Sequence, residues 1–308
     1  MSLKAGIVGL PNVGKSTLFN AITKKNILVA NYPFATIEPN VGIVTVPDER
    51  LGHLEEIYIP EELKPATFEF VDIAGIVKGA SLGEGLGNKF LSHIREVDAI
   101  VEVVRCFDDK EITHVDGSVD PIRDVEVINL ELALADLEII NNRIDKIKKK
   151  AETTKEKETV LEYNALTKAK EALEKDIPLK PHIYLANISE NEIKLEHDYV
   201  KKLKEYAKGE NSKVIVVSAK IESELAELED SDKEEMLNEL GIEKSGLDKL
   251  IEESYNLLGL KTYFTCGPKE VKAWTYKDGM NAKECAGIIH SDFEKGFIKA
   301  EVISYNDL

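Results

Sequence analysis

The feature that most constrains the fold is a run of eight residues, GLPNVGKS, from Gly9 to Ser16. It fits the pattern G-x-x-x-x-G-K-[ST] without a gap. Ala5–Val8 before it predicts a strand, and Thr17–Ile22 after it predicts a helix. A strand that turns through glycines into a helix N-terminus presents free backbone N–H groups and the positive end of a helix dipole. We therefore predict a phosphate-binding loop, in which Lys15 reaches the β- and γ-phosphates and Ser16 ligates Mg²⁺.

The composition is that of a globular protein. The chain has 308 residues, 43% hydrophobic and 31% charged, which is long enough for two domains. No apolar run approaches the roughly 18 to 20 residues that cross a bilayer, and we expect neither a signal peptide nor membrane association. Cys106, Cys266 and Cys285 lack metal-ligand spacing, which is typical of a reduced, cytoplasmic protein.

The net charge of -17 argues against a protein that coats nucleic acid, and we expect no sequence-specific DNA binding. Residues 143–157 are nevertheless locally basic. This stretch leaves contact with RNA or a ribonucleoprotein open, although an ordinary solvated helix surface explains it equally well.

Apolar, β-branched runs alternate with helical patterns along much of the chain, which predicts an α/β fold with a mostly parallel sheet covered by helices. Ligands of such sheets bind at the carboxyl ends of the strands. The predicted strands are Ala5–Val8, Ile43–Thr45, Thr67–Asp72, Ala99–Arg105, His182–Ala186 and Val214–Ser218.

Two departures from this alternation divide the chain. Between about residues 124 and 178, apolar residues recur at three- and four-residue steps in two stretches separated by Glu152–Lys155, which predicts an inserted antiparallel helical hairpin. From residue 259 onward, short runs at Thr262–Thr265, Glu270–Thr275 and Phe297–Ile303 predict strands of a small α+β module, which we expect to be incomplete. The predicted parts are thus 1–123 and 179–258 for the α/β domain, 124–178 for the hairpin and 259–308 for the module.

Three further segments complete a predicted triphosphate site. Asp72 ends an apolar strand, where its carboxylate can hold Mg²⁺ through water, and Gly75 can turn its N–H toward the γ-phosphate. The glycine-rich segment Gly75–Gly87 suits an order–disorder switch driven by γ-phosphate contacts. Thr36, between Pro33 and Pro39, is placed to add a second hydroxyl ligand to Mg²⁺.

The segment expected to read the base departs from the guanine-specific pattern Asn-Lys-x-Asp. The strand at His182–Ala186 is followed by Asn187-Ile188-Ser189-Glu190, with isoleucine for lysine and the longer glutamate for aspartate. We therefore expect weak selectivity for guanine and a site that accepts ATP. Ser218 and Ala219, after another apolar strand, fit the second loop beside the base.

The residue that orients the attacking water is not evident. In many GTPases a glutamine follows the D-x-x-G glycine, but here that position is Ile76. His114, in a polar loop, is our candidate for this role, with a structural histidine as the alternative. Asn12 could help to hold a monovalent cation such as K⁺ beside the phosphates, or could simply make hydrogen bonds within the loop.

Together, GLPNVGKST, NYPFATIEPN, DIAGIVKGAS, NISE and SAKIE resemble the YchF subfamily of the Obg-related GTPases, also called Obg-like ATPases. The segments FTCGPKEVKAWTYKDG and AGIIHSDFEKGFIKAEVISYNDL are similar to its TGS domain. The resemblance covers essentially the whole chain. It implies a cytosolic, Mg²⁺-dependent, ATP-preferring hydrolase whose partner is the ribosome, at its large subunit, through the TGS domain and the hairpin. It also implies nucleotide contacts from Asn12, Val13, Gly14, Lys15, Ser16, Thr17, Gly75, Asn187, Ile188, Glu190, Ser218 and Ala219.

Three functions fit these patterns. The leading hypothesis is an ATP-hydrolysing switch that acts on ribosomes by in-line attack of water on the γ-phosphate. Because Ile76 cannot orient that water, a nucleotide-gated binding module with negligible hydrolysis is the alternative. A small-molecule kinase is disfavoured by the switch-like Gly75–Gly87 segment and by the lack of an arginine-rich lid.

Overall fold

The computed structural model describes residues 3–24, 40–73, 93–154, 156–175, 178–195 and 197–308. The strands in these ranges are β1 (Lys4–Val8), β2 (Val41–Thr45), β3 (Glu62–Lys64), β4 (Thr67–Asp72), β5 (Ala99–Arg105), β6 (His182–Asn187), β7 (Lys213–Val217), β8 (Leu260–Cys266) and β9 (Glu270–Lys277). All six strands predicted for the α/β domain are present, each within two residues of its expected bounds.

The helices in the same ranges follow the order of the chain. They are α1 (Lys15–Lys24), α2 (Glu49–Tyr58), α4 (Pro121–Thr153), α5 (Lys157–Leu173), α6 (Asp198–Gly209), α7 (Ala219–Leu225), α8 (Asp230–Leu240), α9 (Gly246–Leu257), α10 (Ala282–Ile289) and α11 (Ser291–Lys295), with short 3-10 turns at Glu190–Glu192 and Tyr305–Asp307. None of the helices in the described ranges is long and apolar enough to cross a membrane.

The larger sheet has six strands in the order β2-β4-β1-β5-β6-β7. All neighbouring strands run parallel except the edge pair β2 and β4, which is antiparallel. The predicted α/β fold with a mostly parallel sheet is therefore confirmed. Because β1, β5, β6 and β7 are parallel, their carboxyl ends lie along one edge of the sheet.

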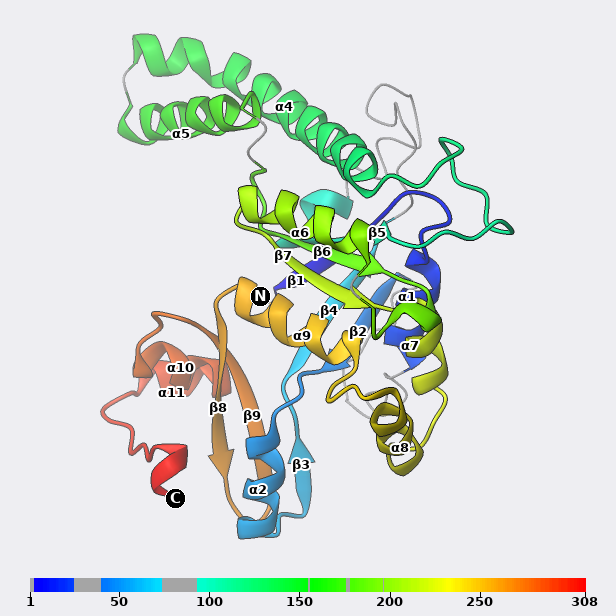
Figure 1. Ribbon diagram of the computed structural model, residues 1–308. Helices are drawn as coiled ribbons and strands as arrows, with labels where there is room; N and C mark the ends of the chain where they lie inside the picture. Colours follow the sequence, from blue (N-terminus) through cyan, green and yellow to red (C-terminus); the bar gives the residue numbers. More distant parts are fainter. Residues whose placement is uncertain (1–2, 25–39, 74–92, 155, 176–177, 196) are drawn as a thin grey trace.

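Helices cover both faces of this sheet (Figure 1). Every residue of β5 and β6 is buried, as expected for central strands of a doubly covered sheet. Successive residues point to opposite faces: Val103 packs in the cluster that includes α1 and α9, and Val104 packs in the cluster that includes α6. The sheet is thus the rigid support for the loops that leave its carboxyl edge.

The inserted hairpin is present. Helix α4 begins after Asp120, whose side chain accepts hydrogen bonds from the main-chain N–H groups of Ile122 and Arg123, and Pro121 occupies its first turn. It packs against α5 along a seam that includes Ile140 and Ile147. The hairpin projects from one end of the molecule, as Figure 1 shows.

The smaller sheet lies at the opposite end and has the order β3-β9-β8 (Figure 1). Sequence analysis missed β3, which comes from the first part of the chain and pairs in parallel with β9. The predicted domain boundaries stay predictions, but the C-terminal module draws one strand from residues 1–123. The predicted strand at Phe297–Ile303 is wrong: no strand forms there, and Ile298 and Val302 are exposed.

Replacing Phe68 with alanine should test how strongly this core holds the sheet. Phe68 is 1% exposed, and its ring meets those of Phe70 and Tyr255 edge-on. We expect Phe68→Ala to lower the free energy of unfolding in urea by about 3–5 kcal/mol, because the side chain leaves a cavity in the core. Phe293→Ala is the matched control, since that ring is 57% exposed and should cost about 0.5 kcal/mol or less. A loss below about 1 kcal/mol for Phe68→Ala would show that this position repacks easily.

Candidate nucleotide-binding site

The predicted phosphate loop leads from the end of β1 into the start of α1. Asn12 and Gly14 have positive φ angles of 64° and 95°, respectively, so the chain turns through two left-handed residues. A side chain at Gly14 would also overlap the Asn187 amide, so glycine is required there. The loop lines an open cavity of about 410 Å³ with Leu10, Pro11, Asn12, Gly14, Lys15, Ser16 and Thr17.

Helix α1 has no acidic residue in its first turn, and Ser16 and Thr17 are exposed there. The first N–H groups of a helix have no intrahelical acceptor, and the helix dipole favours an anion beside them. The loop and this helix end therefore have the features of an anion-binding site.

Lys15 and Asp72 lie side by side at this site and form an ion pair. Their side chains are 11% and 25% exposed, so the pair sits at the mouth of the loop rather than in bulk solvent. Lys15 was predicted to bind the phosphates and Asp72 to hold the Mg²⁺ hydration shell, but their pairing was not predicted. The structure therefore brings these two predicted site residues into contact.

Asn187, the last residue of β6, joins the phosphate loop to the second predicted base loop. Its buried Nδ2 donates to the Val13 carbonyl at 2.8 Å, and its Oδ1 accepts from the Ala219 N–H at 2.9 Å. The structure therefore brings Val13, Asn187 and Ala219, three of the predicted site residues, together.

The residues that follow Asn187 have different environments. Ile188 is 3% exposed and packs in the core beside α6, so its main chain rather than its side chain faces the loops. The Glu190 carboxylate lies 2.5 Å from the Lys220 ammonium. Ser218, 1% exposed, precedes α7, and its hydroxyl has no partner in the described part of the chain. Glu190 and Ser218 thus both lie just beyond the carboxyl ends of the neighbouring strands β6 and β7.

The loop after β5 reaches the phosphate loop. The Asn12 Nδ2 donates to the Thr113 carbonyl at 3.2 Å. His114 is turned toward the hairpin: its Nδ1 accepts from the Asp116 N–H at 3.1 Å, and its Nε2 lies 2.8 Å from Asp124 Oδ2. With Nδ1 accepting, the proton lies on Nε2, which donates to Asp124. Both ring nitrogens are therefore engaged with the protein in this arrangement.

Sequence analysis did not single out Thr113 or Asp124. Thr113 contributes a main-chain carbonyl, which leaves no signal in residue type. Thr36, Gly75 and Ile76 lie outside the described residues, as does the predicted switch segment Gly75–Gly87, so the structure places none of them.

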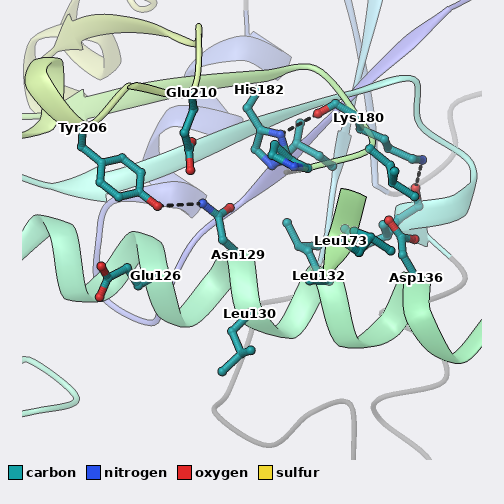
Figure 2. A pocket seen from close by; sticks show the side chains of 15 residues that line it. Glu126, Asn129, Leu130, Leu132, Asp136, Leu173, Lys180, His182, Tyr206 and Glu210 are labelled. Atoms are coloured by element: carbon teal, nitrogen blue, oxygen red, sulfur yellow. Dashed lines mark hydrogen bonds between the residues drawn. The ribbon is translucent and has the colours of Figure 1, made fainter. Parts of the chain in front are cut away.

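A second cavity, of about 470 Å³, lies between α4, α6 and the start of β6 (Figure 2). The His182 side chain lines this cavity. Its Nδ1 forms a hydrogen bond with the Lys180 carbonyl at 2.7 Å, and burial lowers the pKa of the imidazole. His182 and Asn187 are the two ends of β6, about 16 Å apart at the usual rise per residue. The cavity is therefore separate from the phosphate loop.

Comparison with known proteins agrees with this geometry. A family model described as "50S ribosome-binding GTPase" matches residues 4–220, and the YchF-GTPase C-terminal model, described as a protein of unknown function, matches residues 260–308. The Ribosome-binding ATPase YchF of Bacillus subtilis (strain 168) is 59% identical over 331 residues, covering 100% of this chain and 90% of that protein. The protein of the same name from Haemophilus influenzae is 50% identical, with the same coverage. The chain belongs to the YchF family.

A solved YchF structure confirms the fold. The structure of the Schizosaccharomyces pombe YchF GTPase matches with a TM-score of 0.84 and 42% identity, over 96% of this chain and 86% of that one. A GTP-binding protein from Pyrococcus horikoshii OT3 matches with a TM-score of 0.66 over 96% and 92% of the two chains, and at 22% identity it shows the fold alone. The resemblance to YchF that the sequence motifs indicated is thus confirmed.

Asn187→Ala should weaken nucleotide binding in this YchF-family chain. The variant leaves the Val13 carbonyl and the Ala219 N–H without their buried partner, which costs about 1–3 kcal/mol for each group. We expect the Kd of a fluorescent ATP analogue to rise about tenfold or more. Asn238→Ala, at an exposed position on α8, is the control and should leave the Kd unchanged. An unchanged Kd in Asn187→Ala would mean that the two loops hold their positions without this amide.

Proposed function

We propose that the chain is a Mg²⁺-dependent P-loop ATPase, with GTP less favoured, that acts as a nucleotide-dependent switch on ribosomes. The observation that carries this proposal is the joining of the phosphate loop to an altered base segment through Asn187. The names of the relatives, Ribosome-binding ATPase YchF, support it. Ribosome association would place the protein in the cytoplasm.

Phosphate and metal binding would use the residues at the mouth of the loop. Main-chain N–H groups from Asn12 to Thr17 would cradle the phosphates, and Lys15 would exchange Asp72 for the β- and γ-phosphates. The exposed Ser16 hydroxyl and the Asp72 carboxylate fit Mg²⁺, a hard cation that prefers oxygen ligands, and Thr36 is the proposed second hydroxyl. When bound, Mg²⁺ neutralises charge that develops on the phosphates.

Water positioning is proposed for His114. To reach a γ-phosphate its Nε2 would have to leave Asp124, to which it is hydrogen-bonded here. Asn12 is proposed to assist through a K⁺ ion beside the phosphates, with its amide also donating to the Thr113 carbonyl. Gly75 would contribute its N–H to the γ-phosphate and connect that contact to the proposed switch segment.

The preference for ATP is proposed to arise at Asn187–Glu190 together with Ser218 and Ala219. Glutamate is one methylene longer than the aspartate that accepts from guanine N1 and N2, and here its carboxylate pairs with Lys220. Ile188 offers no charged side chain at the base. Guanine therefore loses its bidentate partner, and an adenine amino group is accommodated.

Ribosome binding is proposed for the hairpin and the C-terminal module, which resembles a TGS domain. The end of α4 carries the exposed residues Lys146, Lys148 and Lys149, which suit a phosphate backbone despite the acidic net charge. The family description as a 50S ribosome-binding GTPase supports the large subunit as the partner.

Side-by-side dissociation constants for ATP and GTP analogues with Mg²⁺ test the base assignment. We expect the ATP analogue to bind at least as tightly as the GTP analogue, because Glu190 cannot make the bidentate contact with guanine. Chelating Mg²⁺ should weaken both, since Ser16 and Asp72 would then face the phosphates without the cation. Tenfold tighter binding of GTP, a difference of about 1.4 kcal/mol, would contradict the assignment.

Turnover separates the ATPase from a binding module with negligible hydrolysis. We expect ATP hydrolysis that K⁺ and ribosomes stimulate. Lys15→Ala should abolish both turnover and nucleotide-dependent cosedimentation with ribosomes, because it removes the cation that holds the phosphates. His114→Ala should keep cosedimentation and lose at least about tenfold in turnover. Absence of turnover in the wild-type chain with ribosomes and K⁺ would favour the binding module.

A further inference from the structure

Arg105, the last residue of β5, is only 1% exposed although its guanidinium is permanently charged. Burying such a group is costly unless its N–H donors are satisfied. In the described part of the chain, the hydrogen bonds of this side chain go to main-chain carbonyls of the loop that follows it, at Phe107, Asp109 and Ile112. The loop after β5 therefore wraps around the Arg105 side chain that immediately precedes it.

The three contacts define the path of the loop. Nε donates to the Phe107 carbonyl at 3.2 Å, one terminal nitrogen donates to Ile112 at 3.0 Å, and the other donates to Asp109 at 3.2 Å. The guanidinium carbon also lies 4.7 Å from the centre of the Phe107 ring. One planar group thus fixes both ends of the segment 107–112. A lysine, with one nitrogen, could not reach three carbonyls in this arrangement.

This segment leads directly into the contact with the phosphate loop. Arg105 donates to the Ile112 carbonyl. The next residue is Thr113, and its carbonyl accepts a hydrogen bond from the Asn12 amide at 3.2 Å. His114 comes next and bonds to Asp124 on the first helix of the hairpin. Within the described residues, the hydrogen bonds and the ring contact of the Arg105 side chain lie in its own loop, and that loop in turn contacts both the phosphate loop and α4.

We propose that Arg105 is a positioning residue for nucleotide hydrolysis, acting through the loop 107–114 on the left-handed residue Asn12 of the phosphate loop. The inference rests on the proposed ATPase function. Turnover is more sensitive than ground-state binding to small displacements of the reacting groups. In the proposed site, Lys15 and the main-chain N–H groups of the phosphate loop would hold the phosphates without Arg105, so loss of the Arg105 contacts affects turnover first.

Arg105→Lys tests the proposal, because it keeps the positive charge but cannot make the three hydrogen bonds to main-chain carbonyls. We expect kcat for Mg-ATP to fall at least tenfold while the Kd changes less than threefold. Arg50→Lys is the matched control: Arg50 also donates through two nitrogens, to Asp48, and lies over the Phe264 ring, but it does so beside the smaller sheet. Its kcat should stay at the wild-type value. Wild-type kcat in Arg105→Lys, or equal losses in kcat and affinity, would overturn the proposal.

A double-mutant cycle with Asn12→Ala distinguishes positioning from general stability. If Arg105 acts through the Thr113–Asn12 contact, Arg105→Lys should cost at least threefold less in kcat when Asn12 is already alanine. Additive losses would overturn the proposal. If Arg105→Lys does not fold, Phe107→Leu, which removes the ring beneath the guanidinium, enters the same cycle with the same expected non-additivity.

Amide hydrogen exchange gives a readout that does not require hydrolysis. Arg105→Lys should accelerate exchange at least tenfold within residues 107–117 and leave the strands of the larger sheet unchanged. Acceleration throughout the sheet, or none in this segment, would overturn the positioning role. Failure of the proposed function is seen separately, as absence of ATP turnover in the wild-type chain.

Discussion

The candidate nucleotide site is held together by one buried side chain, the amide of Asn187. Its donor and its acceptor hold segments that are 174 and 32 residues away in the sequence. Its main-chain carbonyl also accepts from the Cys106 N–H at 2.8 Å, which fixes the start of the loop after β5. Four loops can meet at one residue because parallel strands deliver their carboxyl ends to the same edge of the sheet. An antiparallel sheet would have sent every second loop to the opposite edge.

The loop after β5 extends this arrangement from the phosphate loop to the hairpin. It is bonded to Asn12 on one side and, through His114, to Asp124 near the start of α4 on the other. Helix α4 has 33 residues and is therefore about 50 Å long. At that length a tilt of about 5° at its start moves its far end by about 4 Å. A small change beside the phosphate loop is thus geometrically sufficient to displace the proposed ribosome-binding tip.

Sequence patterns predicted the parts of this molecule whose structure is set by neighbouring residues in the chain. The buried strands were found because β5 and β6 are predominantly apolar, and the phosphate loop was found because its residue types are fixed by steric needs such as that at Gly14. Strand β3 was not predicted because it is only three residues long and pairs with residues 270–272, far along the chain. Phe297–Ile303 has a strand-like pattern, but a pattern cannot supply the neighbouring strand that a ladder needs.

The charged residues were harder to predict, because their roles depend on partners that local sequence does not specify. In the sequence, Arg105 is simply the polar residue that ends a mostly apolar strand. Only the folded loop shows that its side chain is buried and bonded to main-chain carbonyls. Lys15 was assigned to the phosphates and Asp72 to the Mg²⁺ hydration shell, whereas the two side chains pair with each other here. In the proposed ATPase this pairing couples the two ligands: Lys15 leaves Asp72 only when a phosphate replaces that carboxylate, and Asp72 is then free for metal-bound water. Each charge is compensated before and after the exchange, so neither is left unpaired at the mouth of the loop. Phosphate and Mg²⁺ binding are for this reason expected to be mutually reinforcing, by the reciprocity that linkage requires.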